Sequence, residues 1–336
     1  MSAALPTNTA TARDLAAAYA PHIAGKTILT TGVSPATLGA VFVEALASSA
    51  SPATFILTGR SPAKLRQTAD ALVALNPAAV VKTVVFDMLS LADVRRAAAE
   101  VIAWDDVPVI DVVVNNAGIM AVDYGLTVDG VEKHLAANHL AHFLFTNLLM
   151  PKILVAPSPR IVNIASDGHR LSPIRWADYN FDNGNTYHKW QAYGQSKTSN
   201  MLFSKGLAKR LGPRGLLAFS VHPGLIFSTQ LAGHLDMSPD GDMASLAALD
   251  RQLGNAAGWM TPEHVAKVQV SADVGSATHV FASFEPSLAD HNGKYLLDAR
   301  VANPYKDDVA PWATNDVEAD KLWILSEKLV GEKFTY

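Results

Sequence analysis

The chain has 336 residues, of which 49% are hydrophobic and 17% are charged, a balance typical of a globular protein with a large core. Its formal net charge of −4 comes from 31 acidic and 27 basic residues scattered along the chain, so the sequence offers no basic face for nucleic acid. It contains no cysteine, which excludes disulfides, thiolate metal ligands and thiol nucleophiles and fits a reducing compartment.

The start of the chain and its longest apolar stretch bear on location. Residues 1–20 lack the basic segment and continuous apolar core of a secretory signal. We interpret residues 1–23 as a lead followed by a short alanine-rich helix. The stretch 135–156 contains Asn138, His139 and Lys152 and is too polar to span a membrane. We therefore expect a cytoplasmic protein without a membrane span.

From residue 26 onward, apolar runs of strand length alternate with patterns of helical period. We predict strands over residues 26–30, 54–57, 80–86, 110–115, 160–165, 216–221 and 294–297. We predict helices over residues 39–49, 62–75, 90–103, 131–154, 190–211 and 261–283. Repeated βαβ units of this kind predict a Rossmann-type α/β fold, a doubly wound parallel sheet of about seven strands with helices on both faces.

One domain is expected over residues 24–300, followed by a C-terminal extension over 301–336 that ends in an amphipathic helix. Residues 225–260 interrupt the alternation of strands and helices directly after a strand end. Ligands of open α/β sheets bind at such ends, so we interpret this segment as a substrate loop or lid. A structural excursion without a ligand is the alternative.

The stretch "TGVSPATLG" lies between the first predicted strand and the first predicted helix. Small residues there let the backbone approach a pyrophosphate, and a helix N-terminus presents free N–H groups. Ala36 or Thr37 stands where a further glycine is usual, although the hydroxyls of Ser34 and Thr37 add donors. The predicted cofactor contacts of this turn are Gly32, Ser34, Thr37, Leu38 and Gly39. A purely structural turn is the alternative.

The second and third predicted strands end in polar residues. Arg60 stands where an NAD-selective enzyme places an acidic residue, and Lys64 follows one helical turn later. Two cations suit a 2′-phosphate, so we predict NADP(H) in preference to NAD(H). Asp87, followed by Met88, closes the third strand, where a carboxylate can accept a hydrogen bond from adenine. A solvated Arg60 and an ordinary turn aspartate are the alternatives.

Four motifs together resemble the short-chain dehydrogenase/reductase family over about residues 24–300. They are the "TGxxxxxLG" turn, "NNAG" at 115–118, Ser166 in "IVNIAS", and Tyr193 with Lys197 in "YGQSK". Within the family the chain is most similar to the retinol-dehydrogenase-like and WW-domain-oxidoreductase-like branch, which includes fungal members. The resemblance implies oxidoreductase activity on a small-molecule carbonyl or alcohol substrate, and it leaves a homodimer open.

The residues of these motifs suit acid–base and hydride-transfer chemistry. Tyr193 and Lys197 are four apart on one predicted helix, and an ammonium placed there is expected to lower the pKa of the phenol from its usual value of about 10. Ser166 at a strand end can hydrogen-bond a substrate carbonyl. By resemblance, Lys197 also reaches the nicotinamide ribose, and Asn138 holds a water that relays protons to Lys197.

The resemblance also supplies the remaining cofactor contacts. They are Asn115, Asn116, Ala117, Gly118, Pro223, Gly224, Ile226 and Thr229, with Ser228 as the alternative to Thr229. For residues 115–118 a structural role supporting the sheet is an equal alternative. Apolar residues of the 225–260 segment suggest a bulky hydrophobic or aromatic substrate, with simple packing of the lid as the alternative. They are Phe227, Leu231, Met237, Met243, Leu246, Leu253, Trp259 and Met260.

Other chemistries lack their motifs. His134, His139 and His142 share a predicted helix, but no HExxH or carboxylate pattern accompanies them, so we expect packed histidines and no metal. No GxSxG elbow surrounds Ser166, which argues against a serine hydrolase. We expect an NADP(H)-dependent oxidoreductase that reduces a ketone or aldehyde or runs the reverse reaction. An epimerase or dehydratase that retains its cofactor, and a non-catalytic NADP-binding sensor, are the alternatives.

Overall fold

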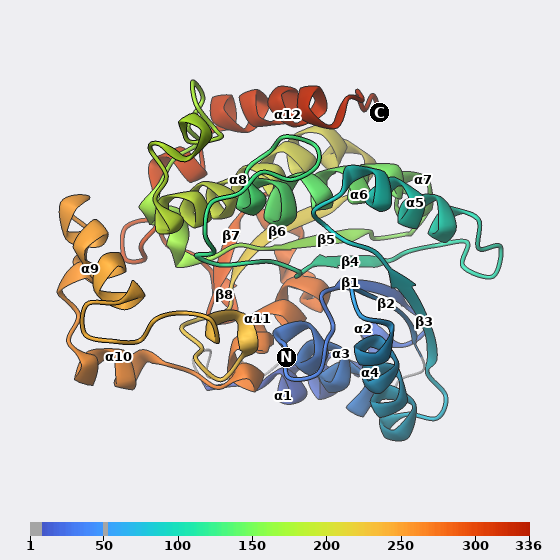
Figure 1. Cartoon of the computed structure of the whole chain (residues 1–336). Coiled ribbons are helices and arrows are strands. Elements are labelled where there is room, and N and C mark those ends of the chain that lie inside the picture. Colours follow the sequence, from blue (N-terminus) through green and yellow to red (C-terminus); the bar gives the residue numbers. More distant parts are fainter. Residues whose placement is uncertain (1–8, 50–52) are drawn as a thin grey trace.

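The computed structural model describes residues 9–49 and 53–336, so residues 1–8 of the predicted N-terminal lead lie outside the described part (Figure 1). Its centre is an eight-stranded sheet with the order β3-β2-β1-β4-β5-β6-β7-β8. The strands are β1 (Thr27–Thr31), β2 (Thr54–Gly59), β3 (Val80–Val85), β4 (Val112–Asn115), β5 (Arg160–Ile164), β6 (Leu217–His222), β7 (Tyr295–Leu297) and β8 (Arg300–Val301). The Rossmann-type fold and all seven predicted strands are confirmed.

Only β8 was not predicted. It pairs antiparallel with β7, through Leu297 opposite Arg300. The two residues between them, Asp298 and Ala299, have φ values of 49° and 51°, as the favoured two-residue hairpin turns require. Neither is a glycine, and two residues are too few for a strand pattern. The sequence therefore carried no clear signal for this hairpin.

Helices cover both faces of the sheet. They are α1 (Ala12–Ala18), α2 (Ala20–Ile23), α3 (Leu38–Ser48), α4 (Pro62–Leu75), α5 (Leu91–Ile102), α6 (Ala141–Leu148), α7 (Met150–Ile153), α8 (Lys189–Leu211), α9 (Asp242–Gln252), α10 (Pro262–Val268), α11 (Ala272–Phe284) and α12 (Asp316–Val330). In Figure 1, α5 to α8 and α12 lie above the sheet, and α1 to α4 and α11 lie below it.

The core is divided between the two faces because successive strand side chains point in opposite directions. Ile28 and Phe55 belong to the cluster on the α3 and α11 side. Their chain neighbours Leu29 and Ile56 belong to the cluster on the α6 and α8 side. Both clusters are fully buried, which explains why the strands appear in the sequence as continuous apolar runs.

Two predicted helices differ from the structure. The helix predicted over 131–154 contains a π-helical segment, Leu135–Leu140, and continues as α6 and α7. The helix predicted over 261–283 is two helices, α10 and α11, because Gln269 bridges to Leu225 and the Ser271 hydroxyl caps a new helix. Long-range pairing of this kind is not visible in local periodicity.

The position of the site follows from the strand order. β1 lies between β2 and β4, so the chain crosses over in opposite directions on the two sides of β1. Such a switch point leaves a crevice at the carboxyl ends of the strands. The segment from Leu225 to Gln269, which carries α9 and α10, extends from the same end at the left of Figure 1. Within the described part of the chain, no helix is long and apolar enough to cross a membrane.

The predicted terminal helix is present as α12. Trp323 on α12 is 4% exposed and its ring packs 5.0 Å from Phe143 and 6.1 Å from Phe203, centroid to centroid. The Arg210 guanidinium lies 4.3 Å from the centre of the same ring. The C-terminal extension is therefore part of the core on this face.

We expect Trp323→Ala to lower the free energy of unfolding by about 3–5 kcal/mol, because it removes a large buried side chain and leaves a cavity. Urea unfolding followed by circular dichroism measures the change. The neighbouring Ile324→Ala is the control, since Ile324 is 65% exposed and its loss should cost less than about 0.5 kcal/mol. Equal stability of the two variants would show that α12 does not dock as described.

Candidate active site

A single cavity of about 560 Å³ runs along the carboxyl ends of the parallel strands. Its walls come from the turn after β1, the ends of β2 to β6, helix α8 and the segment around α9. It brings most of the predicted cofactor residues together with Ser166, Tyr193 and Lys197. Residues scattered over the sequence therefore meet in one continuous space of the size of a ligand site.

The turn after β1 closes without its third glycine. Gly32 has φ +73°, and a Cβ there would lie 2.8 Å from Ala117 Cα, so glycine is required by conformation and by space. Ala36 also adopts a left-handed conformation, at φ 61°. The Thr37 hydroxyl lies 2.9 Å from the Gly32 carbonyl oxygen and 2.7 Å from that of Ser34, so it donates within the turn. Thr37 thus holds the turn in shape. We expected its hydroxyl to donate to a phosphate, but the hydroxyl hydrogen is used within the turn.

The other predicted residues of this turn divide into two groups. Gly32, Ser34, Thr37 and Leu38 line the cavity, and Gly39 does not. A Cβ at Gly39 would lie 2.6 Å from Asn116 Nδ2 and 2.8 Å from the Gly32 oxygen. Gly39 therefore lets α3 pack closely against the turn. The structure thus gives Gly39 a packing role, and its predicted cofactor contact stays a prediction.

The ends of β2 and β3 form one end of the cavity. Arg60 and Lys64 are exposed and line it, and within the described part of the chain neither side chain has an ion-pair partner. Asp87 and Met88 line the same end. The Asp87 carboxylate accepts the Leu89 N–H at 3.0 Å, which fixes the turn that follows β3. Among the described residues, no carboxylate pairs with these two cations.

The "NNAG" segment is partly structural. Asn115 does not line the cavity, and its side-chain amide donates to Thr146 Oγ1 at 3.0 Å and Asn163 Oδ1 at 2.8 Å inside the core. Asn116, Ala117 and Gly118 do line it. These contacts support the structural alternative for Asn115, because strand alternation points its side chain to the face of the sheet that α6 covers.

Three side chains meet in the middle of the cavity. Ser166, which follows β5, is 8% exposed, and Tyr193 and Lys197 on α8 are each 6% exposed. A Cβ at Gly168 would lie 2.8 Å from the Tyr193 ring, and one at Gly194 would lie 2.9 Å from the Gly168 oxygen. These two glycines allow the Ser166 turn to lie directly against Tyr193.

Burial dominates the protonation of this group. Burial raises the pKa of Tyr193, and the neighbouring Ser166 hydroxyl opposes the shift. Burial also lowers the pKa of Lys197 to about 7. Lys197 Nζ donates to the Ile164 carbonyl at 2.8 Å and lies 5.5 Å from the Tyr193 ring centre. The expected lowering of the phenol pKa by Lys197 is therefore wrong for the protein described here, and Tyr193 is protonated at neutral pH.

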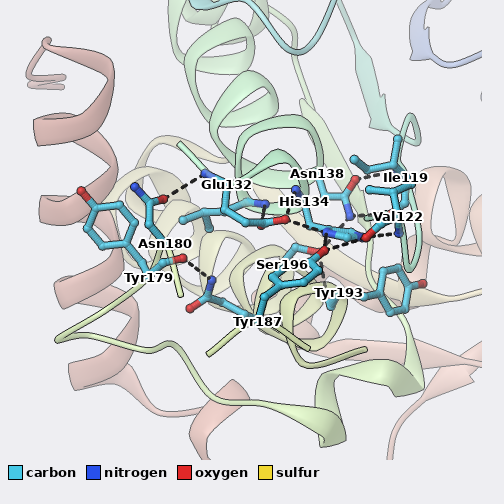
Figure 2. Close-up of polar contacts among 12 residues, drawn as sticks. Ile119, Val122, Glu132, His134, Asn138, Tyr179, Asn180, Tyr187, Tyr193 and Ser196 are labelled. Atoms are coloured by element: carbon cyan, nitrogen blue, oxygen red, sulfur yellow. Dashed lines mark hydrogen bonds and ion pairs between the residues drawn. The ribbon is translucent and has the colours of Figure 1, made fainter. Parts of the chain in front are cut away.

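Asn138 lies in the π-helical segment and has a positioning role (Figure 2). Its amide donates to the Ile119 oxygen at 2.9 Å and Ser196 Oγ at 2.8 Å, and its Oδ1 accepts the Ile119 N–H at 2.8 Å. Its backbone oxygen accepts from Asn200 Nδ2 at 2.8 Å and His142 Nδ1 at 3.0 Å. The side chain and the backbone oxygen of Asn138 are both used in these bonds, which connect it to α8. Asn138 does not line the cavity, so the geometry gives no support to the predicted water relay.

A buried pair behind Tyr193 was not predicted. Glu132 and His134 are both 0% exposed, and Glu132 Oε1 accepts from His134 Nδ1 at 2.7 Å. His134 Nε2 accepts the Val122 N–H at 3.3 Å, and its ring packs edge-on 6.3 Å from that of Tyr193 (Figure 2). Because Val122 lines the cavity, this pair connects the cavity wall to Tyr193. The only sequence signal was a Glu two residues before a His.

The turn after Ser166 carries further charged residues that line the cavity. Asp167 is half-exposed and Arg170 is buried, and they form an ion pair at 2.7 Å. Partial burial raises the pKa of the Asp167 carboxyl, but the facing His222, Arg170 and His169 outweigh it and lower that pKa to about 2. Asp167 is therefore a carboxylate next to Ser166. Sequence reasoning missed both residues because a charged pair in a turn is common on protein surfaces.

The end of β6 and the following segment complete the cavity. Pro223, Gly224, Ile226 and Thr229 line it as predicted. Of the predicted apolar residues, Phe227, Leu231, Met243 and Leu246 line it, whereas Met237, Leu253, Trp259 and Met260 do not. Their places are taken by Met120, Val122, Trp190 and Leu235. The cavity wall is thus apolar and aromatic, but half of the residues expected from the segment alone are elsewhere.

The histidines of the 131–154 region are packed. His139 Nε2 lies 2.7 Å from Ser326 Oγ on α12, and His142 Nε2 lies 2.9 Å from Thr31 Oγ1. Burial lowers the pKa of His139 to about 3 and that of His142 to about 4, so both are neutral. In the described residues no group of histidine and carboxylate side chains is arranged to hold a metal.

Comparison with known proteins agrees with this geometry. The sequence profile of the short chain dehydrogenase family matches residues 26–180. An oxidoreductase of Fusarium equiseti named fscI is 35% identical over 243 residues, which cover 64% of this chain and 93% of that protein. The chain belongs to the short-chain dehydrogenase/reductase family.

Further relatives place it within the family. Retinol dehydrogenase 12 of Bos taurus is 34% identical over 222 residues, covering 66% of this chain and 61% of that protein. A crystal structure of a protein from Mycobacterium paratuberculosis superposes with a TM-score of 0.69 at 30% identity, covering 95% of this chain and 98% of the other. The resemblance to the retinol-dehydrogenase-like branch is thereby confirmed.

Members of this short-chain dehydrogenase/reductase family bind a nicotinamide cofactor, and the residues of this chain fit one. A Cβ at Gly118 would lie 3.1 Å from Asn138 Oδ1 and 3.8 Å from Lys197 Nζ, so glycine keeps the space beside Lys197 open. The cavity is continuous from Arg60 past Gly32 to Lys197. Such a shape suits a long dinucleotide that has phosphates at one end and a reacting ring at the other.

The left-handed Ala36 generates a prediction. We expect Ala36→Gly to stabilise the protein by about 0.5–1 kcal/mol, because alanine at φ 61° is strained whereas glycine is not. Thermal unfolding measures the change. Ala40→Gly on the adjacent helix is the control and should destabilise by about 0.5–1 kcal/mol. A destabilised Ala36→Gly variant would contradict the conformation described for this turn.

Proposed function

We propose that this short-chain dehydrogenase/reductase is an NADP(H)-dependent enzyme that reduces the carbonyl of a bulky hydrophobic or aromatic compound to an alcohol. One observation carries the proposal. Ser166, Tyr193 and Lys197 line the same cavity as Arg60 and Lys64, so acid–base groups and a cationic nucleotide end share one space. The reverse reaction uses the same groups.

The chain's own residues supply the acid–base part of the reaction. A bound dihydronicotinamide supplies a hydride to the carbonyl carbon. Tyr193 is protonated at neutral pH, since burial raises its pKa, and can donate its proton to the carbonyl oxygen. The Ser166 hydroxyl can donate a hydrogen bond to the same oxygen and stabilise its developing negative charge. Lys197, whose pKa is lowered to about 7, exchanges protons readily near neutral pH.

The preference for NADP(H) rests on charge. Directly after β2, where an NAD-selective enzyme has an acidic residue, this chain has Arg60. Its guanidinium and the Lys64 ammonium are exposed and without ion-pair partners in the described part of the chain, so both remain available to a 2′-phosphate. An acidic residue there would instead accept hydrogen bonds from the ribose hydroxyls of NAD.

The substrate class follows from the other end of the cavity. Its wall near Tyr193 contains Trp190, Leu235 and Met243, and Phe227 also lines the cavity. Aromatic and thioether side chains bind large apolar molecules by area and shape. The similarity to a protein whose name refers to retinol supports the same class.

The cofactor preference can be tested by titration. We expect Arg60→Asp to raise the Kd for NADPH about tenfold to hundredfold, since a hydrogen bond to a charged group contributes about 1.5–3 kcal/mol. The Kd for NADH should not rise. Fluorescence titration measures both. Arg66→Asp is the matched control, because Arg66 is exposed on α4, the helix that carries Lys64, and does not line the cavity. An equal loss of NADPH affinity in both variants would count against the assignment.

The reaction can be tested with a screen of aromatic and polycyclic ketones and aldehydes, followed by NADPH absorbance. We expect Tyr193→Phe to lower kcat by about 10²–10⁴-fold with the Kd for NADPH changed less than twofold, because only the transferable proton is lost. Tyr305→Phe, at a side chain that is 95% exposed, is the control. Full activity of Tyr193→Phe would reject Tyr193 as the acid. Product formation without net NADPH consumption would favour a non-redox reaction.

A further inference from the structure

A buried guanidinium connects the turn that follows Ser166 with helix α9 of the predicted lid segment. Arg170 lies in the 3₁₀ turn Asp167–Leu171 and is 7% exposed. Its Nε and Nη2 donate to the two carboxylate oxygens of Asp250 at 2.9 and 2.8 Å. Its Nη1 lies 2.7 Å from Asp167 Oδ2. One planar group therefore grips two carboxylates that are 83 positions apart in the sequence.

The other oxygen of Asp167 reaches the Ser166 hydroxyl. Ser166 Oγ donates to Asp167 Oδ1 at 3.1 Å and accepts the Gly168 N–H at 3.0 Å. The hydroxyl hydrogen thus points toward Asp167. To donate to a substrate oxygen, as the proposed function requires, the Ser166 hydroxyl has to turn away from this carboxylate. The position of Asp167 therefore determines how readily the Ser166 hydroxyl can donate a hydrogen bond to a substrate oxygen.

Asp250 is firmly held at the other end. It is 2% exposed, and its Oδ1 also accepts from Asn255 Nδ2 at 2.9 Å. It lies near the end of α9, the helix on which Met243 and Leu246 line the cavity. The helix that forms part of the substrate wall is therefore the helix that anchors Arg170.

We propose that Arg170 and Asp250 are positioning residues that couple the lid helix α9 to the hydroxyl of Ser166 through Asp167. The inference rests on the proposed function for the role of Ser166. A substrate that packs against Met243 and Leu246 fixes α9, and the chain Asp250, Arg170, Asp167 transmits that position to the hydroxyl beside the reacting oxygen. Arg170 and Asp250 are both buried, so water cannot replace either partner of this ion pair.

A double-mutant cycle tests the coupling. Asp250→Asn preserves shape and removes the charge that holds Arg170. We expect it to lower kcat about tenfold in the wild-type background and less than twofold in the Ser166→Ala background, because the effect passes through Ser166. The substrate is the aromatic ketone or aldehyde reduced fastest in the screen. Arg170→Lys, which keeps the charge but loses the two-pronged contact, should behave in the same way. Equal losses in both backgrounds would overturn the inference.

A second measurement is independent of turnover. Hydrogen exchange of the NADPH-bound protein should show faster exchange in residues 167–171 as well as in α9 for Asp250→Asn. Lys189→Gln is the matched control, since it breaks another ion pair of α9, the 2.9 Å contact of Lys189 with Asp242, that does not reach Ser166. It should loosen α9 without affecting residues 167–171. If Asp250→Asn also leaves residues 167–171 unchanged, the coupling is rejected.

These two measurements separate the coupling from the proposed function. A wild-type protein that reduces carbonyls but shows equal losses in the cycle retains its function and loses the coupling. A wild-type protein that reduces none of the compounds, yet shows faster exchange in residues 167–171 of Asp250→Asn, retains the mechanical link and loses the proposed function.

Discussion

The hydroxyl of Thr31 joins the end of β1 to the exit of β4, next to the cavity. Its oxygen accepts the N–H groups of Asn116 and Ala117, both at 2.9 Å, and it lies 2.9 Å from His142 Nε2. With both lone pairs used, the hydroxyl hydrogen is donated to the histidine. This one buried group fixes the end of β1 against the exit of β4 and against the helix behind them. The turn after β1 and the exit of β4 are held at a fixed spacing by these contacts.

Burial gives the central side chains of this short-chain dehydrogenase/reductase their protonation states. Tyr193 and Lys197 are almost inaccessible, and taking each out of water disfavours its charged form. The phenol therefore keeps its proton, and the lysine approaches neutrality at about pH 7. The raised pKa of Tyr193 keeps its proton in place at neutral pH, where it is available for transfer. A charged cofactor would alter this balance, because fixed charges act strongly where water is excluded.

A buried polar scaffold holds those side chains in position. Asn138 connects the π-helical segment to α8 and to Ile119, and Glu132 with His134 connects the cavity wall to the back of Tyr193. Polar groups without water must be paired within the protein, so each bond constrains the next. The π-helical turn at a functional position agrees with this role, since such turns move a side chain relative to a regular helix. The positions of the cavity side chains thus depend on hydrogen bonds made by residues that do not themselves line the cavity.

The sequence by itself determined the seven parallel strands, because periodicity acts locally, and its motifs named Ser166, Tyr193 and Lys197 through the family resemblance. The lowered phenol pKa and the phosphate-binding Thr37 hydroxyl were expected from local spacing, and the Asn115 contact was expected from the family resemblance. Tertiary structure decided differently, since strand alternation buries Asn115, Lys197 bonds to Ile164, and Thr37 bonds within its turn. It alone brought Arg170 to Asp250 and His134 to Tyr193. Side-chain hydrogen bonds and burial depend on partners distant in the chain, and no local pattern specifies them.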